Sequence, residues 1–231
     1  MLRVHALIPA AGLSVRFGGT TLKQYAHLLG KPVIAHSIDA VRWHPAVIAV
    51  TVALAPDDGI YPELIGSHYP AVKTVQGGSS RAQTVLNGLL YIRQQDTECE
   101  WVLVHDAARP CLPGEDLEAL LKHAPGCRDG AILANPVTDT LKREGASRCI
   151  ENTVDRSRLW AAQTPQLFRL DPLLSNIQAA ISSGTVPTDE AEAMELAGSH
   201  PLLVPGSAHN IKITGPQDLV MAEFILLQRG R

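Results

Sequence analysis

The sequence predicts an α/β fold, a Rossmann-like, mostly parallel twisted sheet with helices on both faces and a projecting β-hairpin arm. Two observations predict it. Short β-branched, apolar runs alternate with segments whose apolar residues recur at helical spacing, which is typical of parallel strands joined by helices. One long polar stretch interrupts this alternation. The 231 residues, 45% of them hydrophobic, suffice for a single domain over residues 1–231.

The elements follow from these patterns in chain order. Residues 4–9 form a short apolar run that ends at small residues, as a strand would. Pro32 opens an amphipathic helix that is expected to end near Pro45. Residues 47–54 (VIAVTVAL) are apolar on both faces, as in a buried strand. The same patterns predict strands at 72–75, 101–104 and 131–134 and helices at 79–95 and 116–123. A ligand is expected beyond the carboxyl ends of these strands.

Residues 136–158 are polar and differ from the rest of the chain. Gly145 lies near their centre, so they predict a β-hairpin. A two-stranded hairpin with few apolar residues is unstable alone, so this arm must lie against the domain or against a partner. From residue 159 the chain returns to core-like segments, and it ends with a predicted strand at 211–213 and a helix that begins at Pro216.

Composition and charge exclude several classes of protein. Twenty basic and 23 acidic residues give a net charge of −3, which disfavours binding to nucleic acid or to a membrane surface. No apolar run reaches the roughly 18–20 residues of a membrane span, and the N-terminus does not resemble a signal peptide. The four cysteines lack the spacing of a metal site and are expected to be reduced thiols. We therefore expect a cytoplasmic protein.

The loop after the first strand is the strongest local signal. Residues 9–12 (PAAG) are small, so their backbone N–H groups can approach a ligand. Arg16 and Lys23 follow and could neutralise a phosphate chain. Spacing alone also allows a plain turn with two solvated cations. The dinucleotide motif G-x-G-x-x-G and the Walker motif are both absent, which disfavours a nicotinamide-dependent oxidoreductase.

Asp106 is the second residue after the predicted strand 101–104, a position at which a carboxylate can hold Mg²⁺ or a ribose hydroxyl. A helix cap or an ion pair with Arg109 is the structural alternative. His105 beside it is expected to be structural. The glycines and serines of residues 77–80 suit an anion or base cradle, and they equally suit a helix N-cap.

Two later segments are ambiguous in the same way. Asp189 and Glu192 fit a helix capping box. Lys212, in the predicted strand 211–213, is either solvated or able to reach a phosphate. No Ser-His-Asp set or G-x-S-x-G motif is present, which argues against a covalent mechanism. Fixed cations with one carboxylate suit phosphoryl or nucleotidyl transfer.

Seven motifs occur in order between residues 9 and 214: PAAG-x-x-x-R with KQY, GG-x-x-R, VHDAARP, TVDR, TPQ, TDEA and NIKIT. Together they resemble the 2-C-methyl-D-erythritol 4-phosphate cytidylyltransferases. The resemblance implies that CTP and methylerythritol phosphate react, with Mg²⁺ or another divalent cation, to give the CDP-linked alcohol and pyrophosphate. The sequence departs from the family pattern at Thr84, where serine is frequent, and at His209, where an acid is frequent.

The resemblance also implies roles for individual residues. Catalytic roles fall on Arg16, Lys23, Arg156 and Lys212, and a metal ion on Asp106. The nucleotide would be bound by Pro9, Ala10, Ala11, Gly12, Gly78, Ser79, Arg81, Thr84, Asp106 and Ala107. The polyol phosphate would be bound by Asp106, Arg109, Thr140, Arg156, Thr164 and Lys212.

In the family the arm is exchanged within a homodimer, so Thr140 and Arg156 would complete the partner's site. Two other functions stay open at this point. One is a ribitol-5-phosphate cytidylyltransferase, which would differ only in its acceptor pocket. The other is a non-catalytic nucleotide-binding module.

Overall fold

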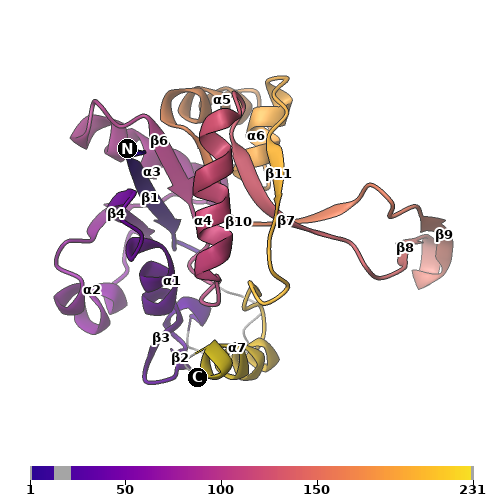
Figure 1. Cartoon of the computed structure of the whole chain (residues 1–231), viewed down its shortest axis with the longest axis horizontal. Helices are drawn as coiled ribbons and strands as arrows, with labels where there is room; N and C mark the ends of the chain where they lie inside the picture. The colour runs from indigo at the N-terminus through magenta and orange to yellow at the C-terminus, as the bar shows by residue number, and fades with distance from the viewer. Residues whose placement is uncertain (1, 13–21, 230–231) are drawn as a thin grey trace.

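A computed structural model describes residues 2–12 and 22–229. Its central sheet has the strand order β11-β7-β10-β6-β1-β4-β5 (Figure 1). Strand β10 pairs antiparallel with β6 and β7, and the other neighbours pair parallel. The predicted mostly parallel α/β sheet is therefore confirmed. The strands are β1 (Val4–Pro9), β4 (Val47–Leu54), β5 (Lys73–Gln76), β6 (Trp101–Val104), β7 (Ala131–Pro136), β10 (Trp160–Arg169) and β11 (Leu202–Pro205).

Helices cover both faces of the sheet because its strands are apolar on both sides. Alternate residues of β1 divide between two buried clusters: Ile8 packs in the cluster that contains α1 and α4, and Leu7 in the one that contains α3 and α5. The helices are α1 (Val33–Arg42), α2 (Ile60–Leu64), α3 (Arg81–Gln95), α4 (Gly114–His123), α5 (Leu170–Ser182), α6 (Glu190–Leu196) and α7 (Pro216–Arg229). Among the helices of the described ranges, none combines the length and apolar content needed to cross a bilayer.

The polar stretch forms the predicted hairpin. Strands β8 (Leu141–Glu144) and β9 (Ile150–Val154) pair antiparallel in a sheet of their own, and Gly145 follows β8. Figure 1 shows this arm extending well away from the body of the molecule, from the ends of β7 and β10. A second small ribbon, β2 (His27–Leu28) with β3 (Lys31–Pro32), precedes α1.

The predicted strand at 211–213 is wrong. These residues belong to no strand, and their backbone is tied to the domain by the Ile213 N–H, which donates to the Ala108 carbonyl at 2.8 Å. The apolar side chains of the segment pack instead with α7, where Ile213 shares a small buried cluster with Ala222 and Ile225. The helix predicted from Pro216 is confirmed as α7.

Candidate active site

A cavity of about 590 Å³ lies beyond the carboxyl ends of β1, β4 and β6. Its wall is made by the residues that follow these strands, by the start of α3, and by two lysines from distant segments. The cavity therefore lies at the carboxyl edge of the sheet, where the sequence predicts a ligand. Of the predicted site residues, those that line it are Pro9, Ala10, Ala11, Gly12, Lys23, Gly78, Ser79, Arg81, Thr84, Asp106, Ala107 and Lys212.

The described start of the loop after β1, residues 10–12, is fixed by hydrogen bonds to the backbone of β4 and to a side-chain amide. The Ala10 N–H donates to the Ala53 carbonyl at 2.7 Å, which continues the pairing of β1 with β4. The buried amide of Gln24 donates to the Ala10 carbonyl at 3.1 Å. Gln24 thus joins the loop to its neighbour Lys23, a role that the sequence analysis missed although Gln24 lies in the KQY motif. Arg16 lies outside the described residues.

The glycine pair before α3 is both a cap and a cradle. Ser80 caps α3 by accepting the Gln83 N–H at 3.1 Å, as the capping interpretation predicts. The Thr84 hydroxyl accepts the Gly78 N–H at 3.1 Å and donates to the Ser80 carbonyl at 2.8 Å. A Cβ atom at Gly78 would collide with the Gln83 side chain. Glycine at this position therefore lets the chain pass close to the first turn of α3 at the cavity wall.

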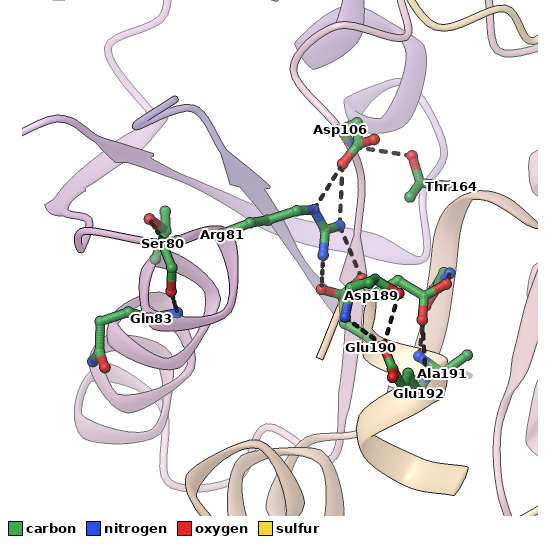
Figure 2. Close-up of polar contacts among 12 residues, drawn as sticks. Ser80, Arg81, Gln83, Asp106, Thr164, Asp189, Glu190, Ala191 and Glu192 are labelled. Atoms are coloured by element: carbon green, nitrogen blue, oxygen red, sulfur yellow. Dashed lines mark hydrogen bonds and ion pairs between the residues drawn. The ribbon is translucent and has the colours of Figure 1, made fainter. Parts of the chain in front are cut away.

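The carboxylate of Asp106 is the electrostatic centre of the site (Figure 2). Its Oδ1 accepts from Arg81 Nη2 at 3.1 Å and Nε at 3.3 Å, and its Oδ2 accepts from Lys212 Nζ at 2.7 Å. The ion pair with Arg109, which the sequence offered as the structural alternative, is also present, but it is longer, at 3.9 Å. Burial alone would raise the pKa of Asp106, but Arg81 and Lys212 outweigh it and hold that pKa far below its ordinary value.

A second buried carboxylate, which the sequence analysis missed, holds the other side of the same guanidinium. Glu190 accepts from Arg81 Nη1 at 2.7 Å and Nη2 at 3.1 Å, and only 1% of its side chain is exposed (Figure 2). Burial raises the pKa of Glu190, against the opposing charge of Arg81. Arg81, Arg109 and Lys212 together carry one more charge than the two carboxylates. The cluster therefore favours an anionic ligand.

Glu190 begins α6, whose cap agrees with the sequence prediction. Asp189 accepts the Glu192 N–H at 2.9 Å, and the Glu192 carboxylate accepts the Thr188 N–H at 2.6 Å. Asp189 also accepts from the Gln166 amide at 2.9 Å. The capping box therefore fixes the position at which Glu190 meets Arg81.

His105 is structural, as expected. It is fully buried, its Nε2 bonds the Arg109 carbonyl at 3.0 Å, and its Nδ1 lies 3.2 Å from the Thr164 hydroxyl. The same hydroxyl accepts the Asp106 N–H at 3.0 Å. The Thr164 hydroxyl therefore fixes the backbone of Asp106. The predicted contact of Thr164 with the polyol phosphate stays a prediction.

The buried histidines give a prediction for stability. Burial lowers the pKa of His5 and of His105 to about 4, so both stay neutral in the folded protein at pH 5. In the unfolded chain each takes up a proton below about pH 6.5. Stability is thus retained above this pH and is lost as pH falls toward 4. We expect the free energy of unfolding to fall by roughly 2 kcal/mol per histidine between pH 7 and pH 5.

Urea denaturation at the two pH values measures this loss. His123, which is exposed at the end of α4, provides the matched control. His5→Gln should remove about half of the pH dependence that the two buried histidines cause, whereas His123→Gln should leave it unchanged. An equal pH dependence in His5→Gln and the parent protein would contradict the assignment.

The remaining predicted residues do not line the cavity. Thr140 and Arg156 are exposed on the arm, away from the cavity of their own chain. Arg109 is largely buried, and its Nη1 donates to the Asn210 carbonyl at 2.6 Å. His209 is exposed and does not line the cavity.

Divalent ions prefer oxygen ligands, and Asp106 is the one carboxylate among the described residues of the cavity wall. Within residues 2–12 and 22–229, no group of three or more His, Cys, Asp or Glu side chains is placed to hold a metal ion. Mg²⁺ commonly takes one or two protein carboxylates and completes its shell with water and substrate phosphates. The residues present therefore fit an ion that arrives with a polyphosphate.

Comparisons of the sequence and of the structure with known proteins agree on one family. The family model described as IspD, 2-C-methyl-D-erythritol 4-phosphate cytidylyltransferase, matches residues 4–228. Proteins of that name from Vibrio vulnificus and Xanthomonas campestris pv. campestris are 43% and 47% identical, over 98% and 99% of this chain and 95% and 86% of theirs. A crystal structure of 4-diphosphocytidyl-2C-methyl-D-erythritol synthase is 40% identical and superposes with a TM-score of 0.84, covering 98% of this chain and 99% of the other.

Proposed function

Since this chain belongs to the 2-C-methyl-D-erythritol 4-phosphate cytidylyltransferase family, we propose that it transfers the cytidylyl group of CTP to methylerythritol phosphate. The products are 4-diphosphocytidyl-2-C-methyl-D-erythritol and pyrophosphate. The relatives described above bear the methylerythritol name, so they support this acceptor over ribitol 5-phosphate. A non-catalytic module is disfavoured because such a module has no need of Arg156 and Lys212, the two cations that would bind the acceptor phosphate.

One observation carries the proposal: the loops at residues 9–12 and 77–80 line the same cavity as Lys23, Lys212 and Asp106. The Ala10, Gly77 and Gly78 N–H groups are bonded within the protein, to Ala53, Leu54 and Thr84. The base and phosphates of CTP would therefore be bound by the other backbone groups of these two loops. Asp106 and Ala107 lie at the end of β6, where a ribose hydroxyl can be held. A nucleotide and a phosphorylated acceptor thus find complementary walls in one space.

The reaction needs positioning and charge more than a base. A phosphate oxygen of the acceptor attacks the α-phosphorus of CTP, the bond from that phosphorus to the bridging oxygen breaks, and pyrophosphate leaves with the electron pair. Because the attacking phosphomonoester is already an anion, no proton has to be removed. Lys23 and Arg16 stabilise the charge that develops around the α-phosphorus, while Lys212 holds the acceptor phosphate.

A divalent ion is part of this proposal. Asp106 and the phosphate oxygens of CTP would hold it, and it would supply charge neutralisation of the triphosphate. Lys212 pairs with Asp106 at 2.7 Å, so its ammonium group lies beside the carboxylate that would hold the ion, where it can also contact the acceptor phosphate. A cytoplasmic location suits the four free thiols of the chain.

The decisive test is pyrophosphate release from CTP and Mg²⁺, with methylerythritol phosphate and ribitol 5-phosphate as separate acceptors. We expect release with the first alone. Release with ribitol 5-phosphate alone would retain the chemistry and overturn the acceptor. No release with either, from folded protein that binds CTP, would support the non-catalytic module.

The exposed arm supports a homodimer in which Arg156 and Thr140 serve the partner's site. Mixing two inactive variants tests this. When Lys212→Ala and Arg156→Ala subunits are co-expressed, each heterodimer contains one site with both changes and one intact site. Half of the dimers are heterodimers, so about a quarter of the parent activity should return.

Each variant alone should stay inactive. A mixture of Lys212→Ala with Lys23→Ala is the matched control, because each of these changes affects the cavity of the subunit that carries it. In that mixture a heterodimer has one change in each site, and no activity should return. Absence of recovery in the first mixture, with heterodimers confirmed by mass, would show that the arm serves its own chain.

A further inference from the structure

Lys212 reaches Asp106 from a segment that no sheet fixes. Residues 211–214 lie outside every strand. Downstream of Lys212, the Ile213 N–H donates to the Ala108 carbonyl and the Thr214 N–H donates to the Asp218 carboxylate. A lysine side chain has four rotatable bonds and is 40% exposed here. The 2.7 Å contact with Asp106 therefore depends on where the backbone before Lys212 is held.

Asn210 holds it. This residue is fully buried, and its Nδ2 donates to the Thr164 carbonyl at 2.8 Å and to Gln163 Oε1 at 3.4 Å. Its own carbonyl accepts from Arg109 Nη1 at 2.6 Å. The side chain and the backbone of one residue are thus tied to two different elements, β10 and the loop after β6.

Thr164 is the common anchor of both members of the ion pair. Its hydroxyl accepts the Asp106 N–H at 3.0 Å, while its carbonyl accepts from Asn210. Asp106 and the segment that carries Lys212 are therefore hydrogen-bonded to the same residue of β10. Asn210 does not line the cavity, so it cannot act by touching the ligand.

We propose that Asn210 is a positioning residue for nucleotidyl transfer, which fixes Lys212 relative to Asp106 through Thr164. The inference rests on the role proposed above for Lys212. An amide is suited to this place because the Thr164 carbonyl requires a donor, and a neutral donor adds no charge beside a cluster that already holds five charged groups.

A double-mutant cycle separates positioning from mere structural support. Asn210→Ala alone should lower kcat about tenfold and change the KM for CTP less than about threefold, because a displaced lysine fails chiefly in the transition state. In a Lys212→Ala background the same change should lower kcat by less than about twofold. Thr51→Val, which removes a buried hydrogen bond to His5 far from the cavity, is the control for stability and should leave kcat unchanged.

Each outcome decides the matter. An undiminished Asn210 effect in the Lys212→Ala background would overturn the positioning role while leaving the proposed function intact. A Lys212→Ala variant with parent kcat would overturn both roles, yet pyrophosphate release by the parent would still establish the reaction. Should Asn210→Ala not fold, Asn210→Leu fills the same space without the amide and is expected to give the same cycle.

Discussion

Replacing Lys212 by alanine is expected to lower kcat for pyrophosphate release about a hundredfold or more, with the KM for CTP changed less than about threefold. The cation meets Asp106 at 2.7 Å on the cavity wall. Its charge is assigned to the acceptor phosphate and to the transition state, so its loss affects turnover rather than CTP binding.

Steady-state kinetics with each substrate varied in turn measures this effect. Lys122→Ala removes an exposed lysine from the end of α4 and serves as the charge-matched control. It should behave as the parent protein. A Lys212→Ala variant that binds CTP more weakly but turns over at the parent rate would place the lysine on the nucleotide instead of the acceptor.

Much of the fold could be predicted because strands that are buried on both faces have apolar residues at nearly every position. Strands β1 and β4 occupy the predicted residues 4–9 and 47–54, since a strand between two helical layers must be apolar throughout. The arm could be predicted for the opposite reason. Residues that cannot form a core do not pair with the main sheet, and β8 and β9 do form a separate ribbon.

The order and direction of the strands could not be predicted. Strand β10 lies antiparallel between β6 and β7. The sequence of an apolar strand does not indicate which strands it pairs with. Residues 211–213 show the converse error. Their alternating pattern satisfies a strand, but their partners are single groups, such as Ala108 for Ile213, and the helix α7.

The site shows the same division. Asp106 and the glycine loop at 77–78 could be found because they follow strands, and strand ends converge at one edge. Glu190 and Asn210 could not be assigned, although both lie within motifs. Their function depends on burial against residues more than 40 positions away, which spacing along the chain does not encode.

The second large effect concerns stability: Arg81→Met is expected to lower the free energy of unfolding by about 3–5 kcal/mol. Arg81 bridges Asp106 and Glu190, and its removal leaves the fully buried Glu190 without an opposite charge. Arg169→Met is the matched control, because its ion pair with Glu100 is exposed. That change should cost about 1 kcal/mol or less.

The pH dependence of this difference identifies its cause. Burial raises the pKa of Glu190 even with Arg81 present, and losing the guanidinium raises it further. A carboxyl whose pKa is higher in the folded than in the unfolded state costs stability as pH rises above its unfolded value near 4.5. The deficit of Arg81→Met relative to the parent should therefore be larger at pH 8 than at pH 5, where Glu190 can take up a proton.

Adding Glu190→Leu to Arg81→Met should then restore stability, because it removes the buried charge that causes the deficit. Urea denaturation of the single and double variants at both pH values measures this. Comparing each variant with the parent at the same pH cancels the contribution of the buried histidines. A deficit that is independent of pH and persists in the double variant would mean that lost packing around the Arg81 side chain, rather than the unpaired carboxylate, destabilises the fold.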